Sequence, residues 1–448
     1  MNVFMKIIVI GANAAGLDAA VAARKTNRVA EITVITEESV ATYSRCGLPF
    51  VLSGKISSFE KLNVYPASTY RIMKLNLLTE TKATHINVDD RNVEAESKDG
   101  KSKILEYDGL VIATGAIPKK SPIEGSDKDG VFTLHTLRDG MEIAKAMKHS
   151  RSACVIGAGY IGLEIAEALI EKGLKTSVVG SRTSVLPSII DSDMALIVKE
   201  HLEKHGVNFI LGKRADAVLG EKKVKGVSVG GSEVEADLVI TATGVEPNVT
   251  LAREAGISIG ETGGIKTNMR METSFKGVYA AGDCAETTNP ITHSSALPLL
   301  GATAVRQGRV AGVNVAGGYS TYPGALSSIV SQMFDFEVGA TGLTELQARR
   351  YGLDAAIGKM RGFTRASYYP DAKPIVVKVI LERESKRIIG GQIVGGEEVT
   401  QRINALSLAI QKNMCGYELV KADTCYAPSV CEASEPMVLA ADMAMRRL

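Results

Sequence analysis

Two segments of the chain carry the same order of apolar runs, glycines and small residues. Each begins with a β-branched apolar run, at residues 6–10 and 153–156, passes through a glycine-rich turn and enters an alanine-rich stretch. Each closes on a further apolar run that ends in Ala-Thr-Gly, at residues 113–115 and 242–244. Short apolar runs that alternate with helical stretches predict buried strands of a parallel sheet. We therefore expect a repeated domain built from strand–helix–strand units.

The glycine turns indicate what the two repeated domains bind. In the first copy Gly11 and Gly16 flank Asn13, which takes the place of the middle glycine. The second copy is complete, with Gly157, Gly159 and Gly162. Without bulky side chains the backbone approaches a pyrophosphate closely, and the following helix N-terminus directs its N–H groups at the phosphates. Asn13 is a tolerable change because Asn enters left-handed conformations more readily than most residues. Both turns thus predict dinucleotide sites.

Two later regions extend this organisation. An apolar strand pattern ends at Gly282-Asp283, where the carboxylate is placed to hydrogen-bond the sugar-alcohol chain of a flavin. Residues 297–312 follow as a small-residue helix that we expect to pack closely on a cofactor. From about Tyr322 the glycine loops give way to alternating strand patterns such as residues 374–381. This change predicts a separate α+β domain at the end of the chain.

Composition narrows the class of protein without changing this picture. Across 448 residues, 52 Lys and Arg face 50 Asp and Glu, so the charge offers no general attraction to nucleic acid or anionic membranes. The 44 glycines, 13 prolines and absent tryptophan suit the tight turns of an α/β protein. Six scattered cysteines are too few for a secreted disulfide scaffold. We expect a cytoplasmic protein without a signal peptide or membrane span, with no nucleic-acid or membrane partner and no metal.

These signatures, in this order, resemble the FAD-dependent pyridine nucleotide-disulfide oxidoreductases over essentially the whole chain. The resemblance implies an α/β fold with two Rossmann-like dinucleotide-binding domains and a C-terminal α+β dimerisation domain. Residues 1–115 and 245–322 would form the FAD-binding domain, residues 116–244 the NAD(P)-binding domain, and residues 323–448 the dimerisation domain of a homodimer.

The resemblance also assigns the cofactor contacts. Asp283 would bind the ribityl chain of FAD, and Glu37, chosen over Glu38 although Thr36 aligns better, would bind the adenosine ribose. In the NAD(P) domain Tyr160 would cover the flavin and Glu164 would contact the nicotinamide ribose or amide. The expected cofactor-binding residues are Gly11, Ala14, Gly16, Glu37, Thr114, Gly115, Gly157, Gly159, Tyr160, Gly162, Glu164, Ser181, Arg182, Gly244, Gly282 and Asp283.

Sulfur determines the chemistry within the family. Cys46 lies in a motif where the dithiol reductases carry a second cysteine five residues later, and here that position is Val51. What remains is a single thiol that cycles with an external sulfur as a mixed disulfide, or with oxygen as a sulfenic acid. The adjacent Arg45 and a helix start after Gly47 would both favour the reactive thiolate.

Members with a single cysteine include coenzyme A disulfide reductases, persulfide reductases, and NADH oxidases and peroxidases. The oxidases and peroxidases typically carry a histidine in the first glycine turn, where this chain has Ala14. Dithiol reductases use a His–Glu pair near the C-terminus, but the last histidine here is His293. Coenzyme A disulfide reductases resemble this chain in having tyrosines that reach the other subunit's active site. These tyrosines correspond to Tyr426 and to either Tyr369 or Tyr368, of which we choose Tyr369.

We therefore predict an NAD(P)H-dependent flavoprotein in which Cys46 reduces the disulfide, persulfide or polysulfide of a small thiol. Coenzyme A is the expected thiol and a candidate ligand of Cys46, with Arg24 and Thr42 as substrate contacts. The alternatives are an oxygen-consuming NAD(P)H oxidase and an electron-transfer component for a protein partner.

Two further features bear on specificity. Gly180 stands where an NADH-selective domain normally has an acid, and Ser181 and Arg182 follow it, so we expect NADPH to be accepted at least as well as NADH. Cys425 and Cys431 bracket Tyr426, and they either exchange with a mixed disulfide or fill the interface as small apolar side chains.

Overall fold

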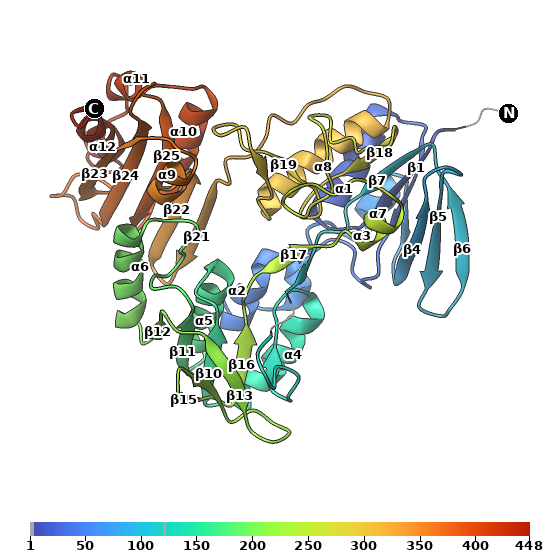
Figure 1. The fold of residues 1–448 in the computed structure, drawn as a ribbon, viewed down its shortest axis with the longest axis horizontal. Helices are drawn as coiled ribbons and strands as arrows, with labels where there is room; N and C mark the ends of the chain where they lie inside the picture. Colours follow the sequence, from blue (N-terminus) through green and yellow to red (C-terminus); the bar gives the residue numbers. More distant parts are fainter. Residues whose placement is uncertain (1–3, 120–121) are drawn as a thin grey trace. The chain divides into compact units, whose positions relative to one another are not determined.

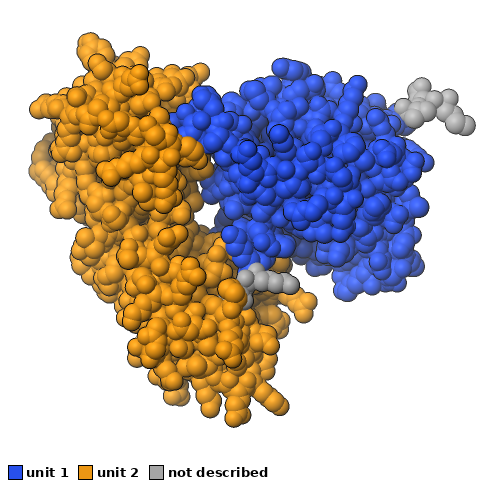
Figure 2. Space-filling model, viewed as in Figure 1, with its two compact units in different colours: residues 1–47, 58–119, 245–325 blue, residues 48–57, 120–244, 326–448 orange. Residues whose placement is uncertain are grey.

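The computed structural model describes residues 4–119 and 122–448, which form two compact units (Figure 2). The first unit contains residues 1–47, 58–119 and 245–325. The second contains residues 48–57, 120–244 and 326–448. The units thus group the expected NAD(P) and dimerisation segments together and add residues 48–57, which the sequence assigns to the FAD domain. The three-domain division stays a prediction.

A five-stranded parallel sheet forms the centre of the first unit. Its strand order is β18 (Val278–Ala280), β7 (Gly109–Ile112), β1 (Lys6–Ile10), β2 (Glu31–Ile35) and β3 (Leu75–Leu78). The strands are apolar and almost fully buried because elements cover both faces. Helices α1 (Ala14–Thr26) and α8 (Gly301–Val315) lie on one side, and the antiparallel strands β4 (Thr81–Asn87), β5 (Asn92–Ser97) and β6 (Ser102–Glu106) lie on the other (Figure 1).

Short elements complete this unit. They are the 3₁₀ turns η1 (Arg45–Gly47) and η2 (Phe59–Leu62), helices α3 (Ala67–Ile72) and α7 (Thr250–Glu254), and the strand pairs β8 (Ala116–Pro118) with β17 (Val245–Pro247) and β19 (Thr287–Thr288) with β20 (Ser295–Ala296).

Small residues let helices α1 and α8 touch backbone to backbone. A Cβ atom added to Gly308 would lie 2.2 Å from the carbonyl oxygen of Ala15, and one added to Gly312 would lie 2.1 Å from that of Ala19. The small-residue pattern predicted at residues 297–312 therefore packs on the helix that follows the first glycine turn. This contact fixes the helix N-terminus beside that turn.

The second unit repeats the parallel sheet and adds an antiparallel one. The parallel sheet has the order β12 (Asn208–Leu211), β11 (Lys175–Gly180), β10 (Ser152–Ile156), β16 (Leu238–Thr241) and β9 (Val131–Phe132). Helices α2 (Leu48–Ser53), α4 (Leu137–Met147), α5 (Tyr160–Glu171) and α6 (Ser192–Lys204) accompany it. The strands β13 (Ala215–Leu219), β14 (Gly226–Val229) and β15 (Ser232–Glu235) share its apolar core, as the corresponding antiparallel strands do in the first unit.

The antiparallel sheet belongs to the last third of the chain. Its order is β21 (Ile329–Met333), β22 (Phe336–Gly342), β25 (Ile388–Gly395), β24 (Pro374–Glu382) and β23 (Ala355–Phe363). Its helices are α9 (Glu345–Arg350), α10 (Val399–Gln411), α11 (Gly416–Val420) and α12 (Pro436–Met445). These sheets confirm the predicted fold class. No helix in residues 4–119 or 122–448 combines the length and apolarity needed to cross a bilayer.

A buried lysine on the antiparallel sheet binds the start of helix α6, which accompanies the parallel sheet. Lys378 on β24 is 3% exposed, and its Nζ lies 2.9 Å from carboxylate oxygens of both Asp191 and Asp193 at the start of α6. Gln392, the cross-strand neighbour of Lys378, donates to Asp191 at 2.7 Å. Burial lowers the pKa of Lys378, but hydrogen bonds and charge from the aspartates outweigh it and raise the pKa overall. The lysine stays charged and holds helix α6 on the sheet.

Replacing Lys378 by Met should destabilise this unit by about 3–5 kcal/mol, because the largely buried Asp191 carboxylate loses its counter-charge. Lys359→Met removes another lysine that binds Asp193, but one on the rim, and should cost no more than about 1 kcal/mol. Calorimetric unfolding of the two variants measures the difference. Equal losses in the free energy of unfolding would show that Lys378 does not hold helix α6 on the sheet.

Candidate functional site

The first glycine turn forms a cradle for a phosphate group. Gly11 has φ +107°, and a Cβ atom on it would lie 2.1 Å from the carbonyl oxygen of Ala113. A Cβ on Gly16 would lie 1.8 Å from the carbonyl oxygen of Gly11, so both positions require glycine. Asn13 caps helix α1 by accepting from the N–H of Ala14 at 2.9 Å. Its Nδ2 is buried without a hydrogen-bond partner among the described residues, as expected of a donor that awaits a ligand.

A second unpaired amide lies beside the same helix. Gln307 on α8 is fully buried, and its Oε1 accepts from the N–H of Gly282 at 2.9 Å. Its Nε2 has no partner within the part of the chain that the structure describes. Asp283 follows at once, and burial raises the pKa of its carboxyl while the charge of Arg45 opposes the rise. Two amide donors and one largely buried carboxylate around α1 fit the phosphates and hydroxyls of a flavin dinucleotide.

The loop that carries Cys46 is attached to the first glycine turn. Thr42 is buried and donates through Oγ1 to the carbonyl oxygen of Ala12 at 2.6 Å. The backbone N–H of Ser44 donates to the carbonyl oxygen of Leu62 at 2.8 Å. Cys46 itself lies exposed in η1, directly before the chain enters α2. An accessible thiol thus stands on a loop that is fixed to the phosphate-binding backbone.

Charged residues near this loop are already engaged. Arg45 pairs with Glu38 at 2.5 Å, so its charge is shared and its predicted support for the thiolate is reduced. Glu37, the predicted ribose ligand, is exposed just beyond β2.

Arg24, near the end of helix α1, is held by backbone groups. Its guanidinium donates to the carbonyl oxygens of Met73, Lys74, Arg28 and Asn27 at 2.9 to 3.4 Å. These bonds give Arg24 a role in holding α1 to the chain before β3. Its role as a substrate contact stays a prediction.

The Ala-Thr-Gly signature of the first domain meets the chain where it returns from the second. Thr114 donates through Oγ1 to the carbonyl oxygen of Asn248 at 2.6 Å, and Asn248 donates to that of Gly115 at 2.9 Å. Gly115 and Gly244 have φ values of +70° and +104°, which suit glycine at the ends of these crossing strands.

The second glycine turn repeats the geometry of the first. Gly157 has φ +129°, and its Cβ would lie 2.2 Å from the carbonyl oxygen of Ala242. A Cβ on Gly162 would lie 2.0 Å from the carbonyl oxygen of Gly157. Around Gly159, by contrast, nothing lies within 4 Å of a Cβ, so the space beside the helix N-terminus is open. This open space at the head of α5 fits the pyrophosphate of a second dinucleotide.

Tyr160 and Glu164, the residues predicted to cover the flavin and to contact the nicotinamide, both form hydrogen bonds to hairpin β21–β22. Tyr160 is buried, donates to the carbonyl oxygen of Val338 at 3.3 Å, and has its pKa raised by burial. Glu164 accepts from Ser331 at 2.5 Å, and burial raises its pKa as well. Their predicted roles as flavin cover and nicotinamide contact stay predictions.

The end of β11 carries no acidic side chain. A Cβ on Gly180 would lie 2.8 Å from Cδ2 of Leu211 and 3.2 Å from Cβ of Ala158, so this position is closely packed. Ser181 and Arg182 follow, and both are exposed. The Arg182 side chain has no ion pair or hydrogen bond to a described residue, which leaves its guanidinium open to an anion.

Of the two tyrosines considered beside Tyr426, Tyr368 is the one that contacts it within the chain, and the choice of Tyr369 at the active site stays a prediction. The hydroxyl of Tyr368 lies 3.4 Å from the hydroxyl of Tyr426, and both side chains are exposed. This hydrogen bond is the largest cause of the raised pKa of Tyr426. Tyr369 makes no such contact among the described residues. The structure thus pairs Tyr426 with Tyr368, the second of the two candidates.

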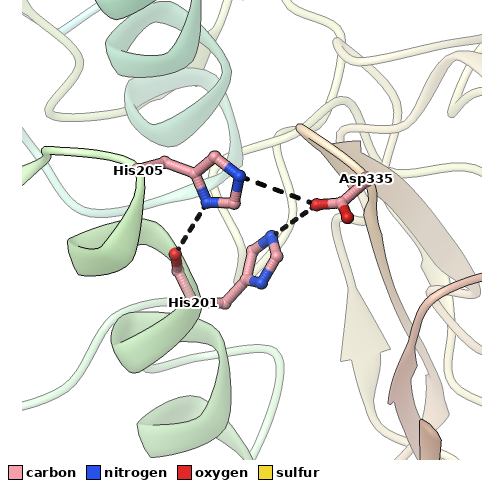
Figure 3. Close-up of side chains that lie close together, drawn as sticks. All are labelled: His201, His205 and Asp335. Carbon is pink, nitrogen blue, oxygen red and sulfur yellow. Dashed lines mark hydrogen bonds and ion pairs between the residues drawn. The ribbon is translucent and has the colours of Figure 1, made fainter. Parts of the chain in front are cut away.

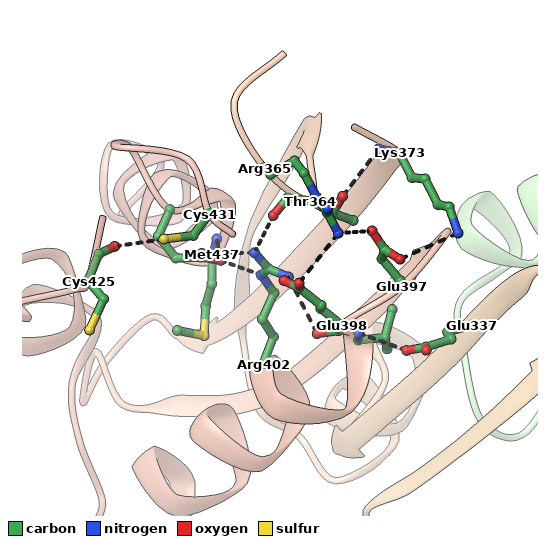
Figure 4. Close-up of polar contacts among 12 residues, drawn as sticks. Glu337, Thr364, Arg365, Lys373, Glu397, Glu398, Arg402, Cys425, Cys431 and Met437 are labelled. Atoms are coloured by element: carbon green, nitrogen blue, oxygen red, sulfur yellow. Dashed lines mark hydrogen bonds and ion pairs between the residues drawn. The ribbon is translucent and has the colours of Figure 1, made fainter. Parts of the chain in front are cut away.

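An ion-pair network holds the two tyrosine loops in place (Figure 4). Arg365 pairs with Glu397, and Lys373, at the other end of the same loop, lies 3.4 Å from Glu397. Arg402 is buried and binds Glu435, in the loop after Tyr426, at 2.7 Å. The N–H of Ala366 also donates to the carbonyl oxygen of Pro428 at 3.3 Å, which joins the loops directly.

The two cysteines beside Tyr426 form no disulfide. Cys431 accepts from the N–H of Ala427 at 3.3 Å, and its thiol contacts the carbonyl oxygen of Cys425 at the same distance. Figure 4 shows the sulfur of Cys425 directed away from Cys431. Cys431 therefore has a local role in shaping the turn that carries Tyr426.

Comparison with known proteins assigns this arrangement to a family. Residues 5–308 match the pyridine nucleotide-disulphide oxidoreductase family, and residues 330–438 match its dimerisation domain. The chain is 43% identical to an NADH oxidase of Methanocaldococcus jannaschii over 99% of both chains. It is 34% identical to an NAD(P)H coenzyme A polysulfide/persulfide reductase of Pyrococcus horikoshii over 98% of both chains.

A solved structure shows the same likeness in three dimensions. The NAD-dependent persulfide reductase of A. fulgidus superposes with a TM-score of 0.96 at 38% identity, covering 99% of this chain and 83% of that one. The family models, the relatives and this structure all point to the same family. The chain is a member of the pyridine nucleotide-disulphide oxidoreductases, as its sequence signatures predict.

Proposed function

We propose that the protein is an NAD(P)H-dependent flavoprotein that reduces the disulfide or persulfide of a small thiol of the coenzyme A type through Cys46. The observation that carries this proposal is one exposed thiol on a loop that Thr42 bonds to the first glycine turn, with Val51 in place of a second cysteine. Relatives named for NAD(P)H-dependent coenzyme A persulfide and disulfide reduction support the same chemistry.

The chain's own residues suggest how the reaction proceeds. The Cys46 thiolate attacks one sulfur of the substrate disulfide, the S–S bond breaks, and a mixed disulfide with Cys46 forms while the second thiolate leaves. The Asn13 turn, Gln307 and Asp283 would hold FAD, which would supply the two-electron chemistry between NAD(P)H and sulfur. Cys46 returns to the thiolate when its mixed disulfide is reduced by two electrons and the bound thiol leaves. Both leaving thiolates take up a proton.

Tyr426 is the candidate proton donor. Its hydroxyl is exposed, and the hydrogen bond with Tyr368 raises its pKa, so it remains protonated at neutral pH. In a homodimer, which the match to the dimerisation domain supports, the partner subunit's Tyr426 would approach the sulfur that leaves Cys46. A protonated phenol there hydrogen-bonds the leaving thiolate.

Oxygen reduction is the second candidate, because the Methanocaldococcus jannaschii relative is named an NADH oxidase. Ala14 opens helix α1 where oxidases typically carry a histidine, so no imidazole stands there to orient a peroxide oxygen. Anaerobic oxidation of NAD(P)H with coenzyme A disulfide, coenzyme A persulfide and polysulfide, set against oxygen, separates the two candidates. We expect the sulfur acceptors to give the higher kcat/KM.

Cys46→Ser should leave FAD bound and the flavin reducible by NAD(P)H, but should lower disulfide turnover at least about 100-fold, because a hydroxyl does not replace the thiolate as nucleophile. Cys425→Ser removes another exposed thiol and serves as the matched control. Steady-state turnover and stopped-flow flavin reduction separate the two steps. Turnover that survives in Cys46→Ser would rule out the proposed mechanism.

Tyr426→Phe should lower kcat for disulfide reduction about 10- to 100-fold, since general acids contribute on this scale or above. Tyr368→Phe should have a smaller effect of the same sign, because it removes the hydrogen bond to Tyr426. Tyr369→Phe is the control and should stay within about twofold of the parent enzyme. A larger loss in Tyr369→Phe than in Tyr368→Phe would instead support Tyr369 as the second active-site tyrosine.

Arg182→Ala should raise the KM for NADPH about tenfold, the weight of one charge-assisted hydrogen bond to the 2′-phosphate, and should change the KM for NADH by less than twofold. Arg151→Ala is the control, because Arg151 directly precedes β10 and Arg182 lies beyond the far end of the neighbouring parallel strand β11. Flavin reduction by each nucleotide provides both constants. A strong preference for NADH in the parent enzyme, unaltered in the variant, would exclude this role of Arg182.

A further inference from the structure

Two histidines and an aspartate meet where helix α6 ends (Figure 3). His201 and His205 are four residues apart and therefore share one face of the helix end. Asp335 lies opposite, in the two-residue turn Phe334-Asp335 that joins β21 to β22. The sequence predicts no metal here, because the histidine pair and the aspartate come from two segments more than 120 residues apart.

The donor atoms have the spacing of a tetrahedral metal site. Nε2 of His201 lies 3.1 Å and Nε2 of His205 lies 3.7 Å from Oδ1 of Asp335. Zinc–nitrogen and zinc–oxygen bonds of about 2.0–2.2 Å at tetrahedral angles place neighbouring donors about 3.4 Å apart. The two measured distances bracket that value, and all three donor atoms lie within 4.8 Å of one another.

Hydrogen bonding within the cluster leaves the metal-facing nitrogens available. Nδ1 of His205 lies 2.9 Å from the carbonyl oxygen of His201 and is placed to donate to it, which leaves Nε2 as the nitrogen that faces Asp335. Nε2 of His201 is shielded from water, yet it has no hydrogen bond of proper direction to any described residue, Asp335 included. A cation between the three groups would satisfy both nitrogens and the carboxylate.

Aromatic rings hold the donors in position. Phe336 stacks on His201 with ring centroids 4.5 Å apart, and Phe334 stacks on His205 at 4.2 Å. Phe334 has φ +56°, a conformation that is costly for a bulky residue. The turn adopts this conformation with one phenyl ring packed against each imidazole, so little freedom remains to be lost on binding an ion.

Charge and access also suit a divalent cation. Asp335 brings a carboxylate to the two imidazoles and supplies the negative charge of the cluster. Lys204 lies close enough to His201 for its charge to oppose a cation. Asp335 is 73% exposed, which leaves an open side for entry and for a water as fourth ligand.

We propose that His201, His205 and Asp335 bind one divalent transition-metal ion, of which Zn²⁺ fits the two-imidazole, one-carboxylate set and its tetrahedral spacing best. The ion would join the end of helix α6 to hairpin β21–β22. The site contains neither Cys46 nor the glycine turns, and it holds whether or not the function proposed above is correct.

Metal binding to the FAD-loaded, tag-free protein tests the proposal. The protein is treated with EDTA and its exposed thiols are alkylated, so that cysteines do not bind the probe. Co²⁺ then reports the ligand set, and Zn²⁺ measured by mass spectrometry after gel filtration reports the stoichiometry. We expect one ion per chain, and cobalt d–d absorption of tetrahedral intensity without a thiolate-to-metal charge-transfer band.

Variants assign the ligands. His205→Gln and Asp335→Asn should each weaken Zn²⁺ binding at least tenfold, and neither side chain is buried. His149→Gln, an exposed histidine outside the cluster, should bind as the parent does. Circular dichroism and flavin content confirm that each variant is folded. No stoichiometric binding, or equal binding in all three variants, would overturn the proposal.

Discussion

Backbone contact at the two glycine turns is the constraint on which the nucleotide-binding parts of this protein depend. The carbonyl oxygen of Ala113 would lie 2.1 Å from a Cβ on Gly11, and that of Ala242 would lie 2.2 Å from one on Gly157. Each glycine turn therefore touches the Ala-Thr-Gly segment that follows a later strand of the same sheet. The two signatures recur together in the sequence because they form one packed structure, which brings a helix N-terminus to the edge where the strands end.

The sequence predicts this part of the molecule well, because the physics there is local and repeated. Strand, turn and helix follow each other within about twenty residues, and glycines mark the positions that exclude a Cβ. Fold class and family are confirmed by the sheets and the comparisons. The roles of individual side chains at the cofactors stay predictions, since they depend on groups that these residues would bind.

Other features are invisible to sequence patterns because they join distant segments or depend on side-chain direction. Tyr368 and Tyr369 are adjacent in an irregular loop, and no period indicates which hydroxyl faces Tyr426. Residues 48–57 follow Cys46 directly, yet α2 packs on α4 and α5 of the second unit. Arg24 looks like a free helix-end arginine, but its partners lie in the segment before β3.

Hairpin β21–β22 joins helices α5 and α6 to the antiparallel sheet through three separate contacts. Ser331 donates to Glu164 at 2.5 Å, Val338 accepts from Tyr160 at 3.3 Å, and Asp335 faces His201 at 3.1 Å. Glu164 and Tyr160 open helix α5 at the second glycine turn, where a dinucleotide would bring its charge. A nucleotide that displaced either side chain would remove a hydrogen bond from the hairpin, because the hairpin supplies the present partner of both. Such a displacement would link nucleotide binding at the turn thermodynamically to the conformation of the hairpin.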